Sequence, residues 1–173
     1  MAWSLSCKRR LFQACQNGTP AASHTLFGMD FGDSRQGDRP YVRVLVVEDD
    51  DEARGVIVTM LRKLFGVFAE GARNGQEALQ SLFMVHPHLI LCDLQMPRLD
   101  GFGFVRKLRG DPKFGRILTI AVTGLAHPVD VAAAREAGFD GHVVKPLTAT
   151  TLARLLDRAW DMRDAGDTPE DAA

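Results

Sequence analysis

Five polar residues in this sequence could together form one chemically active site. Each one follows a separate apolar run, at the point where a buried strand would reach the surface. Clustered carboxylates would repel one another unless a cation is present, and Mg²⁺ prefers a few carboxylates together with water and a phosphate oxygen. A hydroxyl and an ammonium group suit the oxygens of a phosphoryl group. The residues that predict this metal-dependent phosphoryl chemistry are Glu48, Asp49, Asp93, Thr123 and Lys145.

Asp93 is the predicted nucleophile, because an Asp carboxylate can attack phosphorus and form an aspartyl phosphate. The loop that follows it contains Met96, Pro97 and Gly101, and we expect this loop to leave Asp93 exposed at a strand end. Taken singly, such residues have ordinary explanations, for example a turn or a solvated lysine. We assign the rest of the acidic run, residues 50–52, to a helix N-terminus, which favours negative charge.

Alternating strand and helix patterns must position these residues. Apolar runs predict strands at 42–47, 67–72, 89–92, 117–122 and 141–144. Helical spacing predicts helices from an N-cap at Asp50 or Asp51 to Gly66, and at about 74–85, 102–108, 129–137 and 148–161. Strands that are apolar on both faces need helices on both sides of a sheet. We therefore expect an α/β fold, a flavodoxin-like doubly wound five-stranded parallel sheet in the order 2-1-3-4-5, with ligands bound at the carboxyl ends of the strands.

Helical spacing also predicts which side chains face the core. We expect three of the helices to bury apolar residues at i, i+3 and i+4 positions. The predicted core residues are Ala53, Val56, Ile57, Met60, Leu61 and Leu64 in the first helix, Ala78, Leu79, Leu82 and Phe83 in the second, and Leu152, Leu155, Leu156 and Trp160 in the last.

Length and composition indicate one folded domain. A chain of 173 residues that is 46% hydrophobic can bury one full core. Residues 1–40 lack a sustained period and predict a disordered or loosely attached leader, residues 41–161 the domain, and residues 162–173 a solvated acidic tail. The net charge of -1 and the balanced charges of the middle segment give no sign of nucleic-acid binding.

The predicted compartment is the cytoplasm. Three cysteines without a CxxC pair fit a reducing environment. No apolar run approaches the ~18 residues of a membrane span, and the stretch after the basic residues 8–10 is too polar for a signal peptide.

Four segments resemble the receiver domains of two-component response regulators. They are VLVVEDD at 44–50, LILCDLQMPRLDG at 89–101, AVTG at 121–124 and VVKPL at 143–147. Their spacing agrees with the compact stand-alone members that are similar to chemotaxis regulators, and the resemblance covers about residues 41–161.

The resemblance implies a role for each site residue. Asp93 would be the phosphoacceptor. Asp49 and Asp93 would ligate Mg²⁺ directly, with the backbone carbonyl of Gln95 as a further ligand and Glu48 acting through water. Thr123 would donate a hydrogen bond to the phosphoryl group, and Lys145 would pair with it. The Lys145–Pro146 peptide bond is typically cis in this family.

The resemblance also implies partners. A sensor histidine kinase or a histidine phosphotransfer protein would donate the phosphoryl group, and the chain would catalyse its own phosphorylation and dephosphorylation without being an enzyme in the usual sense. The surface of the helix at 129–137, the strand at 141–144 and the helix at 148–161 would then change. Only about twelve residues follow the last helix, so we expect output through a downstream effector protein or onward relay, without direct contact to nucleic acid or membrane.

Two positions depart from the family pattern. His142 stands where many members have Tyr or Phe as a switch side chain, and imidazole is smaller, more polar and titratable near neutral pH. We expect the movement of Thr123 to survive and the aromatic readout to differ. Gly124 stands where a small Ala is common and would loosen the loop after Thr123.

Three other functions remain as alternatives. A metal-dependent phosphohydrolase would need a second Asp two residues after the nucleophile, where this chain has Gln95. A degenerate receiver acting as a constitutive binding module is disfavoured because all five site residues are present. A flavodoxin-like cofactor protein would need a Gly-rich phosphate loop after the first strand. We interpret three histidines as structural or solvent-facing, because no metal-ligand spacing joins His86, His88 and His127.

Overall fold

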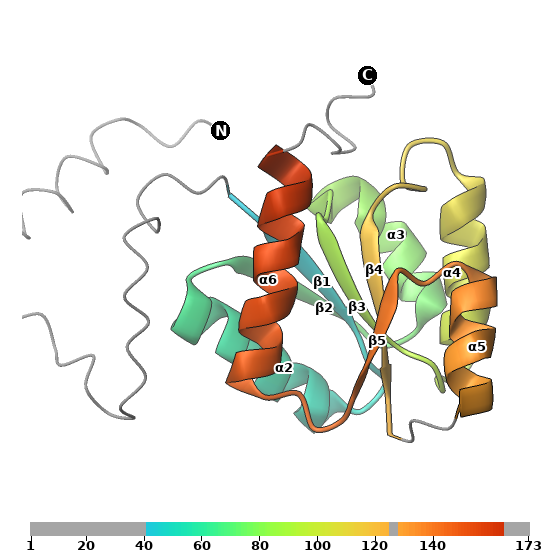
Figure 1. The fold of residues 1–173 in the computed structure, drawn as a ribbon, viewed down its shortest axis with the longest axis horizontal. Helices are drawn as coiled ribbons and strands as arrows, with labels where there is room; N and C mark the ends of the chain where they lie inside the picture. Colours follow the sequence, from blue (N-terminus) through green and yellow to red (C-terminus); the bar gives the residue numbers. More distant parts are fainter. Residues whose placement is uncertain (1–40, 125–127, 165–173) are drawn as a thin grey trace, which may run out of the picture. The chain divides into compact units, whose positions relative to one another are not determined.

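The computed structural model describes residues 41–124 and 128–164, so the predictions for residues 1–40, for His127 and for the tail from residue 165 lie outside the described part. Within these ranges the chain forms one parallel sheet in the order β2-β1-β3-β4-β5 (Figure 1). This confirms the predicted fold. The strands are β1 (Arg43–Val47), β2 (Phe68–Ala72), β3 (Leu89–Asp93), β4 (Leu118–Thr123) and β5 (Gly141–Val144).

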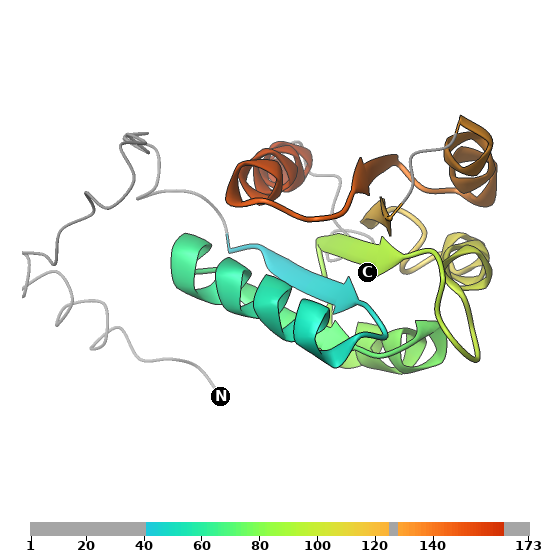
Figure 2. The same cartoon turned by 90° about the horizontal axis from the view of Figure 1, so that it is seen from below.

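Helices cover both faces of the sheet (Figure 2). One face packs against α2 (Asp51–Phe65) and α6 (Ala149–Asp164), and the other against α3 (Gly75–Val85), α4 (Gly101–Gly110) and α5 (Pro128–Ala137). Successive residues of a strand point to opposite faces, so each strand contributes to both cores. None of the described helices is long and apolar enough to cross a membrane.

Local signals in the sequence fix where the helices begin and end. Asp50 is the N-cap of α2 and accepts a hydrogen bond from the Ala53 N–H at 2.7 Å. Asn74 caps α3 by accepting from the N–H groups of the two residues at positions 76 and 77, both at 3.0 Å. Gly66 ends α2 with φ +65°, a conformation that glycine adopts without strain. These caps confirm the predicted helix boundaries, and those at Asp50 and Asn74 lie at the carboxyl ends of β1 and β2.

Three side chains predicted to be buried are instead exposed. Val56, Leu64 and Phe83 have exposed fractions of 58%, 60% and 58%. In α2 only the stripe of Ile57 and Leu61 is buried, because the strands and α6 cover a narrower part of the helix than its apolar residues span.

The exposed ring of Phe83 meets Phe114 edge-on at a centroid distance of 4.9 Å. One further position differs from the sequence predictions. At the C-terminal end, α6 continues to Asp164, so Met162 belongs to the helix and packs against the core instead of starting a solvated tail.

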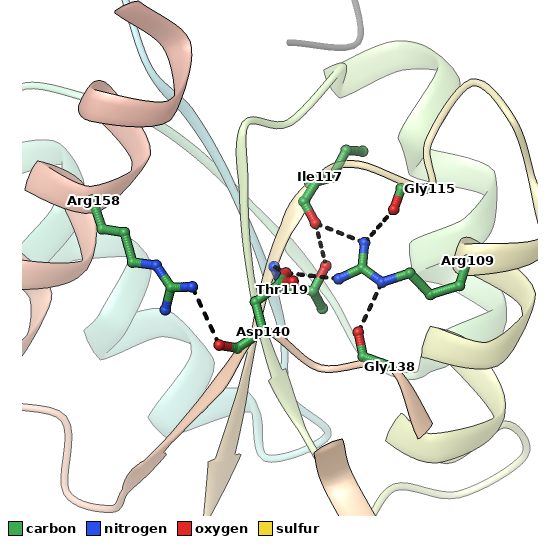
Figure 3. A network of polar contacts seen from close by, with 7 residues as sticks. All are labelled: Arg109, Gly115, Ile117, Thr119, Gly138, Asp140 and Arg158. Carbon is green, nitrogen blue, oxygen red and sulfur yellow. Dashed lines mark hydrogen bonds and ion pairs between the residues drawn. The ribbon is translucent and has the colours of Figure 1, made fainter. Parts of the chain in front are cut away.

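An arginine near the end of α4 ties several loops together at the amino ends of the strands (Figure 3). Arg109 donates from Nε to the carbonyl of Gly138 at 2.8 Å, and from Nη1 to the carbonyls of Gly115 at 2.6 Å and Ile117 at 3.0 Å. Its Nη2 donates to the Asp140 carboxylate at 2.7 Å. One guanidinium therefore joins the end of α4 to the segments that lead into β4 and β5.

Asp140 extends this network. Its Oδ2 also accepts a hydrogen bond from the Thr119 N–H at 2.7 Å, and its own N–H donates to the Thr119 carbonyl at 2.9 Å. Arg158 of α6 donates to the Asp140 carbonyl at 3.2 Å. The network thus fixes the starts of β4 and β5 relative to helices on both faces, at the edge of the sheet opposite to the predicted site.

Candidate functional site

The five predicted site residues lie where strands end. Glu48 and Asp49 follow β1, Asp93 is the last residue of β3, Thr123 is the last residue of β4, and Lys145 follows β5. Since all five strands described here are parallel, these ends share one edge of the sheet. This placement agrees with the expectation drawn from the sequence.

Three carboxylates form a compact cluster at this edge. One oxygen from each of Glu48, Asp49 and Asp93 lies within 4.8 Å of the others. Glu48 and Asp93 are buried, with exposed fractions of 2% and 8%, whereas Asp49 is exposed. The expectation that Asp93 is exposed was therefore wrong, and only one of the three carboxylates faces solvent freely.

Lys145 lies between two of these carboxylates. Its Nζ is 2.7 Å from Glu48 Oε2 and 2.5 Å from Asp93 Oδ2. The lysine side chain is 31% exposed, so its ammonium group is within reach of both buried carboxylates and of solvent. Lys145 thus compensates part of the negative charge that burial would otherwise make costly.

The electrostatic environment of the cluster raises the pKa of both Glu48 and Lys145. Burial raises the pKa of Glu48 above its ordinary value of 4.5, with a further contribution from the charge of Asp93, although the hydrogen bond from Lys145 opposes the rise. For Lys145, burial acts to lower the pKa, but the hydrogen bonds to Asp93 and Glu48 outweigh it and raise the pKa above 10.5. The ammonium group is therefore held in its charged form, while the carboxylates remain in excess.

The loop after β3 explains why Asp93 is buried. The Gln95 N–H donates to Asp93 Oδ1 at 3.2 Å, and the Gly101 N–H donates to the Leu94 carbonyl at 3.1 Å, so the loop folds back over the strand end. A Cβ atom at Gly101 would lie only 2.3 Å from the Asp93 carbonyl oxygen. Gln95 itself has an exposed side chain. The close approach requires glycine at position 101.

The same loop is also fixed against α3. The Gly75 N–H donates to the Leu99 carbonyl at 2.9 Å, and Asp100 caps α4 by accepting from the Gly103 N–H at 2.7 Å. Arg98 adopts φ +68°, which is unfavourable for a residue with a side chain. The phosphoacceptor candidate is thus followed by a closely packed loop that contains one strained residue.

The switch candidates lie on β4 and β5. Thr123 is buried, and its carbonyl accepts a hydrogen bond from the Lys145 N–H at 2.8 Å, which links the two strand ends. His142 is exposed on β5, where it pairs in register with Ala121. Gly124 is exposed, and a Cβ atom placed there would have no neighbour within 4 Å. The Lys145–Pro146 peptide bond is cis.

One residue at the site escaped the sequence-based reasoning. Arg54 of α2 donates from Nη1 to the Glu48 carbonyl at 2.8 Å and also approaches the Asp49 carbonyl at 3.4 Å. A basic residue soon after an acidic run was the only available signal, and it does not reveal where a long side chain points. The arginine contacts the backbone of both acidic residues.

The cluster has the ligand chemistry of a divalent-cation site. Three carboxylates and one ammonium group leave two negative charges in excess, which one divalent ion would neutralise. Carboxylate oxygens suit a hard ion such as Mg²⁺, which keeps part of its water shell, and the exposed Asp49 gives access from solvent. The residues present therefore fit magnesium.

Comparison with protein families gives a match to the response regulator receiver domain over residues 44–157. Over 118 residues the chain is 38% identical to a gliding motility regulatory protein of Myxococcus xanthus, covering 68% of this chain and 15% of that protein. It is 35% identical over 115 residues to an uncharacterized 14.6 kDa protein of Leptolyngbya boryana, covering 66% of this chain and 87% of that protein. The chain therefore spans a small part of the first relative and most of the second.

Among solved structures, the chain is similar to the receiver domain of a sensor histidine kinase from Pseudomonas aeruginosa. The sequence identity is 31% and the TM-score 0.63, with 70% of this chain and 98% of the other covered. That structure has a magnesium ion coordinated in its active site cleft.

Proposed function

Because this chain belongs to the response regulator receiver domain family, we propose that it accepts a phosphoryl group on Asp93 from a sensor histidine kinase or a histidine phosphotransfer protein. The observation that carries this proposal is the position of Lys145 between Glu48 and Asp93, next to the exposed carboxylate of Asp49. A nucleophile, a cation and a metal-binding set are thereby gathered at one edge of the sheet.

Asp93 supplies an oxygen of its carboxylate as the nucleophile. A P–O bond forms to this oxygen while the P–N bond of the donor's phosphohistidine breaks, and the bonding electrons return to the imidazole nitrogen. The Gln95 N–H at 3.2 Å from Oδ1 and Lys145 Nζ at 2.5 Å from Oδ2 orient the carboxylate. Lys145 then pairs with a phosphoryl oxygen, and the hydroxyl of Thr123 donates a hydrogen bond to another.

Four residues would hold Mg²⁺ at this site. Asp49 and Asp93 would be direct ligands together with the Gln95 backbone carbonyl, and Glu48 would act through water. When bound, the ion supplies positive charge that neutralises the phosphoryl oxygens as the group is transferred. Among the residues of this chain, Lys145 supplies the second positive charge, with Nζ 2.5 Å from Asp93 Oδ2.

Phosphorylation would change the surface formed by α5, β5 and α6. Thr123 and Lys145 end neighbouring strands and are joined by the hydrogen bond between the Lys145 N–H and the Thr123 carbonyl. A dianion that draws both side chains inward therefore acts on β5, whose exposed residues include His142 and Val144. A downstream effector protein would read this surface, and loss of the phosphoryl group by self-catalysed hydrolysis would reset it.

Incubation with acetyl phosphate and Mg²⁺ tests the phosphoacceptor. Intact-mass measurement should show one added phosphoryl group on the wild-type protein and none on Asp93→Asn. Asp100→Asn is a matched control in the same loop, because Asn keeps the N-cap while removing a carboxylate, and it should be phosphorylated like the wild type. Equal phosphorylation of the Asp93→Asn variant would refute the assignment.

The switch surface needs a separate test. Hydrogen exchange of β5 and α6 should differ between the phosphorylated and unphosphorylated wild type, and this difference should be lost in Thr123→Ala. If His142 reports the switch, His142→Phe should alter binding of the effector without altering phosphorylation of Asp93. Identical exchange in both phosphorylation states would argue against switching on this face.

A further inference from the structure

Arg54 holds the turn that carries two of the acidic residues. Its Nη1 donates to the carbonyl of Glu48 at 2.8 Å and approaches that of Asp49 at 3.4 Å, while its Nη2 donates to the carboxylate of Asp51. The side chain is only 13% exposed. One guanidinium therefore spans the backbone between the end of β1 and the start of α2.

The path of this side chain is confined by β2. A Cβ atom at Gly71 would lie 2.9 Å from Cδ and 3.1 Å from Cγ of Arg54. Gly71 pairs in register with Val46, one strand position before the end of β1. The absence of a side chain at Gly71 thus makes space for the aliphatic part of Arg54, and the hydrogen-bond acceptors at the turn hold its guanidinium group.

The two acidic residues depend on this turn to different extents. Glu48 is buried and its carboxylate is held by Lys145 at 2.7 Å, whereas Asp49 is exposed. The position of the Asp49 carboxylate therefore relies on the backbone that Arg54 fixes. Since Mg²⁺ demands nearly octahedral ligand geometry, an imprecisely placed carboxylate weakens binding.

We propose that Arg54 is a positioning residue that raises the Mg²⁺ affinity of the site by fixing the backbone of Glu48 and Asp49. This inference rests on the proposed function, because it presumes that the acidic cluster binds Mg²⁺. According to this proposal, a positively charged side chain next to the metal site favours metal binding.

Simple charge repulsion predicts the opposite effect. A positive guanidinium near the carboxylates would weaken Mg²⁺ binding, so its removal would strengthen binding. The ion pair with the Asp51 carboxylate offsets much of that charge locally. The sign of the change on removing Arg54 therefore separates a positioning role from a charge effect.

Isothermal titration calorimetry of the full chain with MgCl₂ measures this sign. Arg54→Gln should weaken Mg²⁺ binding about tenfold, as is typical when a residue that orients a metal ligand is lost. Arg54→Lys keeps the charge, but a single ammonium cannot reach two carbonyls and a carboxylate with the same geometry, so it should restore only part of the affinity. In the acetyl phosphate reaction, Arg54→Gln should need more Mg²⁺ for half-maximal phosphorylation and reach a similar maximal rate.

Two further variants separate the loss of a positive charge from the loss of positioning. Arg62→Gln removes an arginine of the same helix that donates from Nε to the Ala69 carbonyl at 2.9 Å, away from the acidic turn, and should leave Mg²⁺ binding unchanged. Gly71→Ala keeps every charge but displaces the stem of Arg54, and should weaken binding in the same direction as Arg54→Gln.

The outcomes distinguish the two proposals. A wild-type protein that does not bind Mg²⁺ would overturn the proposed metal site itself. A wild type that binds Mg²⁺, together with an Arg54→Gln variant that binds equally well or more tightly, would overturn the positioning role alone. Should Arg54→Gln fail to fold, unchanged Mg²⁺ affinity in Gly71→Ala would overturn it instead.

Discussion

Replacing Arg109 with methionine should lower the free energy of unfolding by about 3 kcal/mol. The substitution keeps most of the apolar stem but removes the hydrogen bonds to the carbonyls of Gly138, Gly115 and Ile117 and to the Asp140 carboxylate. Hydrogen bonds of charged groups contribute roughly 1.5–3 kcal/mol each when buried. The arginine and aspartate side chains are 22% and 35% exposed, so we use a smaller contribution, about 0.5–1 kcal/mol for each contact.

Urea unfolding followed by circular dichroism measures this loss. With an m-value of about 1.5 kcal/mol per molar urea, the midpoint should fall by about 2 M. Arg106→Met is a matched control, because Arg106 is an exposed arginine of the same helix, and it should change the free energy by less than about 0.5 kcal/mol.

The position of the network adds a second readout. Arg109 acts at the amino ends of β4 and β5 (Figure 3), whereas Asp93 lies at the carboxyl end of β3. The folded Arg109→Met variant should therefore accept the phosphoryl group at the wild-type rate. A loss of stability below about 1 kcal/mol would refute the view that this network holds the strands in place.

Three further substitutions test local features of the fold. Without Mg²⁺, Glu48→Gln should gain stability relative to the wild type as the pH rises above about 4.5, because burial raises the pKa of Glu48 above that ordinary value and the ionised carboxylate is then the less stable form in the folded protein. Urea unfolding at several pH values would show the opposite trend if Lys145 outweighed burial. Arg98→Gly should raise the free energy of unfolding by about 0.5 kcal/mol, because glycine relieves the strain of φ +68° although it has more freedom in the unfolded chain. Arg98→Ala should leave the free energy of unfolding nearly unchanged, and equal values for both variants would show that the backbone is not strained there. Gly101→Ala should lower the free energy of unfolding by roughly 3 kcal/mol, because its Cβ atom would meet the Asp93 carbonyl. Gly55→Ala, whose Cβ atom would have nothing within 4 Å, should raise the free energy of unfolding by about 0.8 kcal/mol. Thermal unfolding of the two variants shows whether close packing determines the loop conformation.

The order of the strands and the placement of the site residues followed from local signals. Apolar runs marked the strands, and Asp50, Asn74 and Gly66 marked the helix ends. Each of these signals is contained in a few consecutive residues of the sequence. Once the strands are known to be parallel, the polar residues after them must share an edge. The positions of Asp93 and Lys145 could be predicted for this reason.

The burial of Asp93 could not be predicted in the same way. It depends on how the loop after β3 folds back, which is set by the approach of Gly101 to the strand end and by the contact of Leu99 with Gly75. These contacts join residues that no periodic pattern connects.

Long polar side chains were equally inaccessible to sequence reasoning. Arg54 reaches back over its own helix start, and Arg109 meets groups 29 and 31 residues further along the chain. The exposed fraction of Val56 was missed because helical spacing identifies an apolar stripe, whereas the packed neighbours decide how much of it is covered.

The sheet divides the apolar interior into two compartments. Leu61 and Leu152 lie on one side, Phe104 and Leu108 on the other, and the strand backbones separate them. Strain from a substitution in one compartment is relieved mainly by neighbours in the same compartment, and effects on opposite sides should add. Such a chain can acquire mutations on the side of α3 and α4 without repacking α2 and α6, so its two helical faces are free to evolve at different rates.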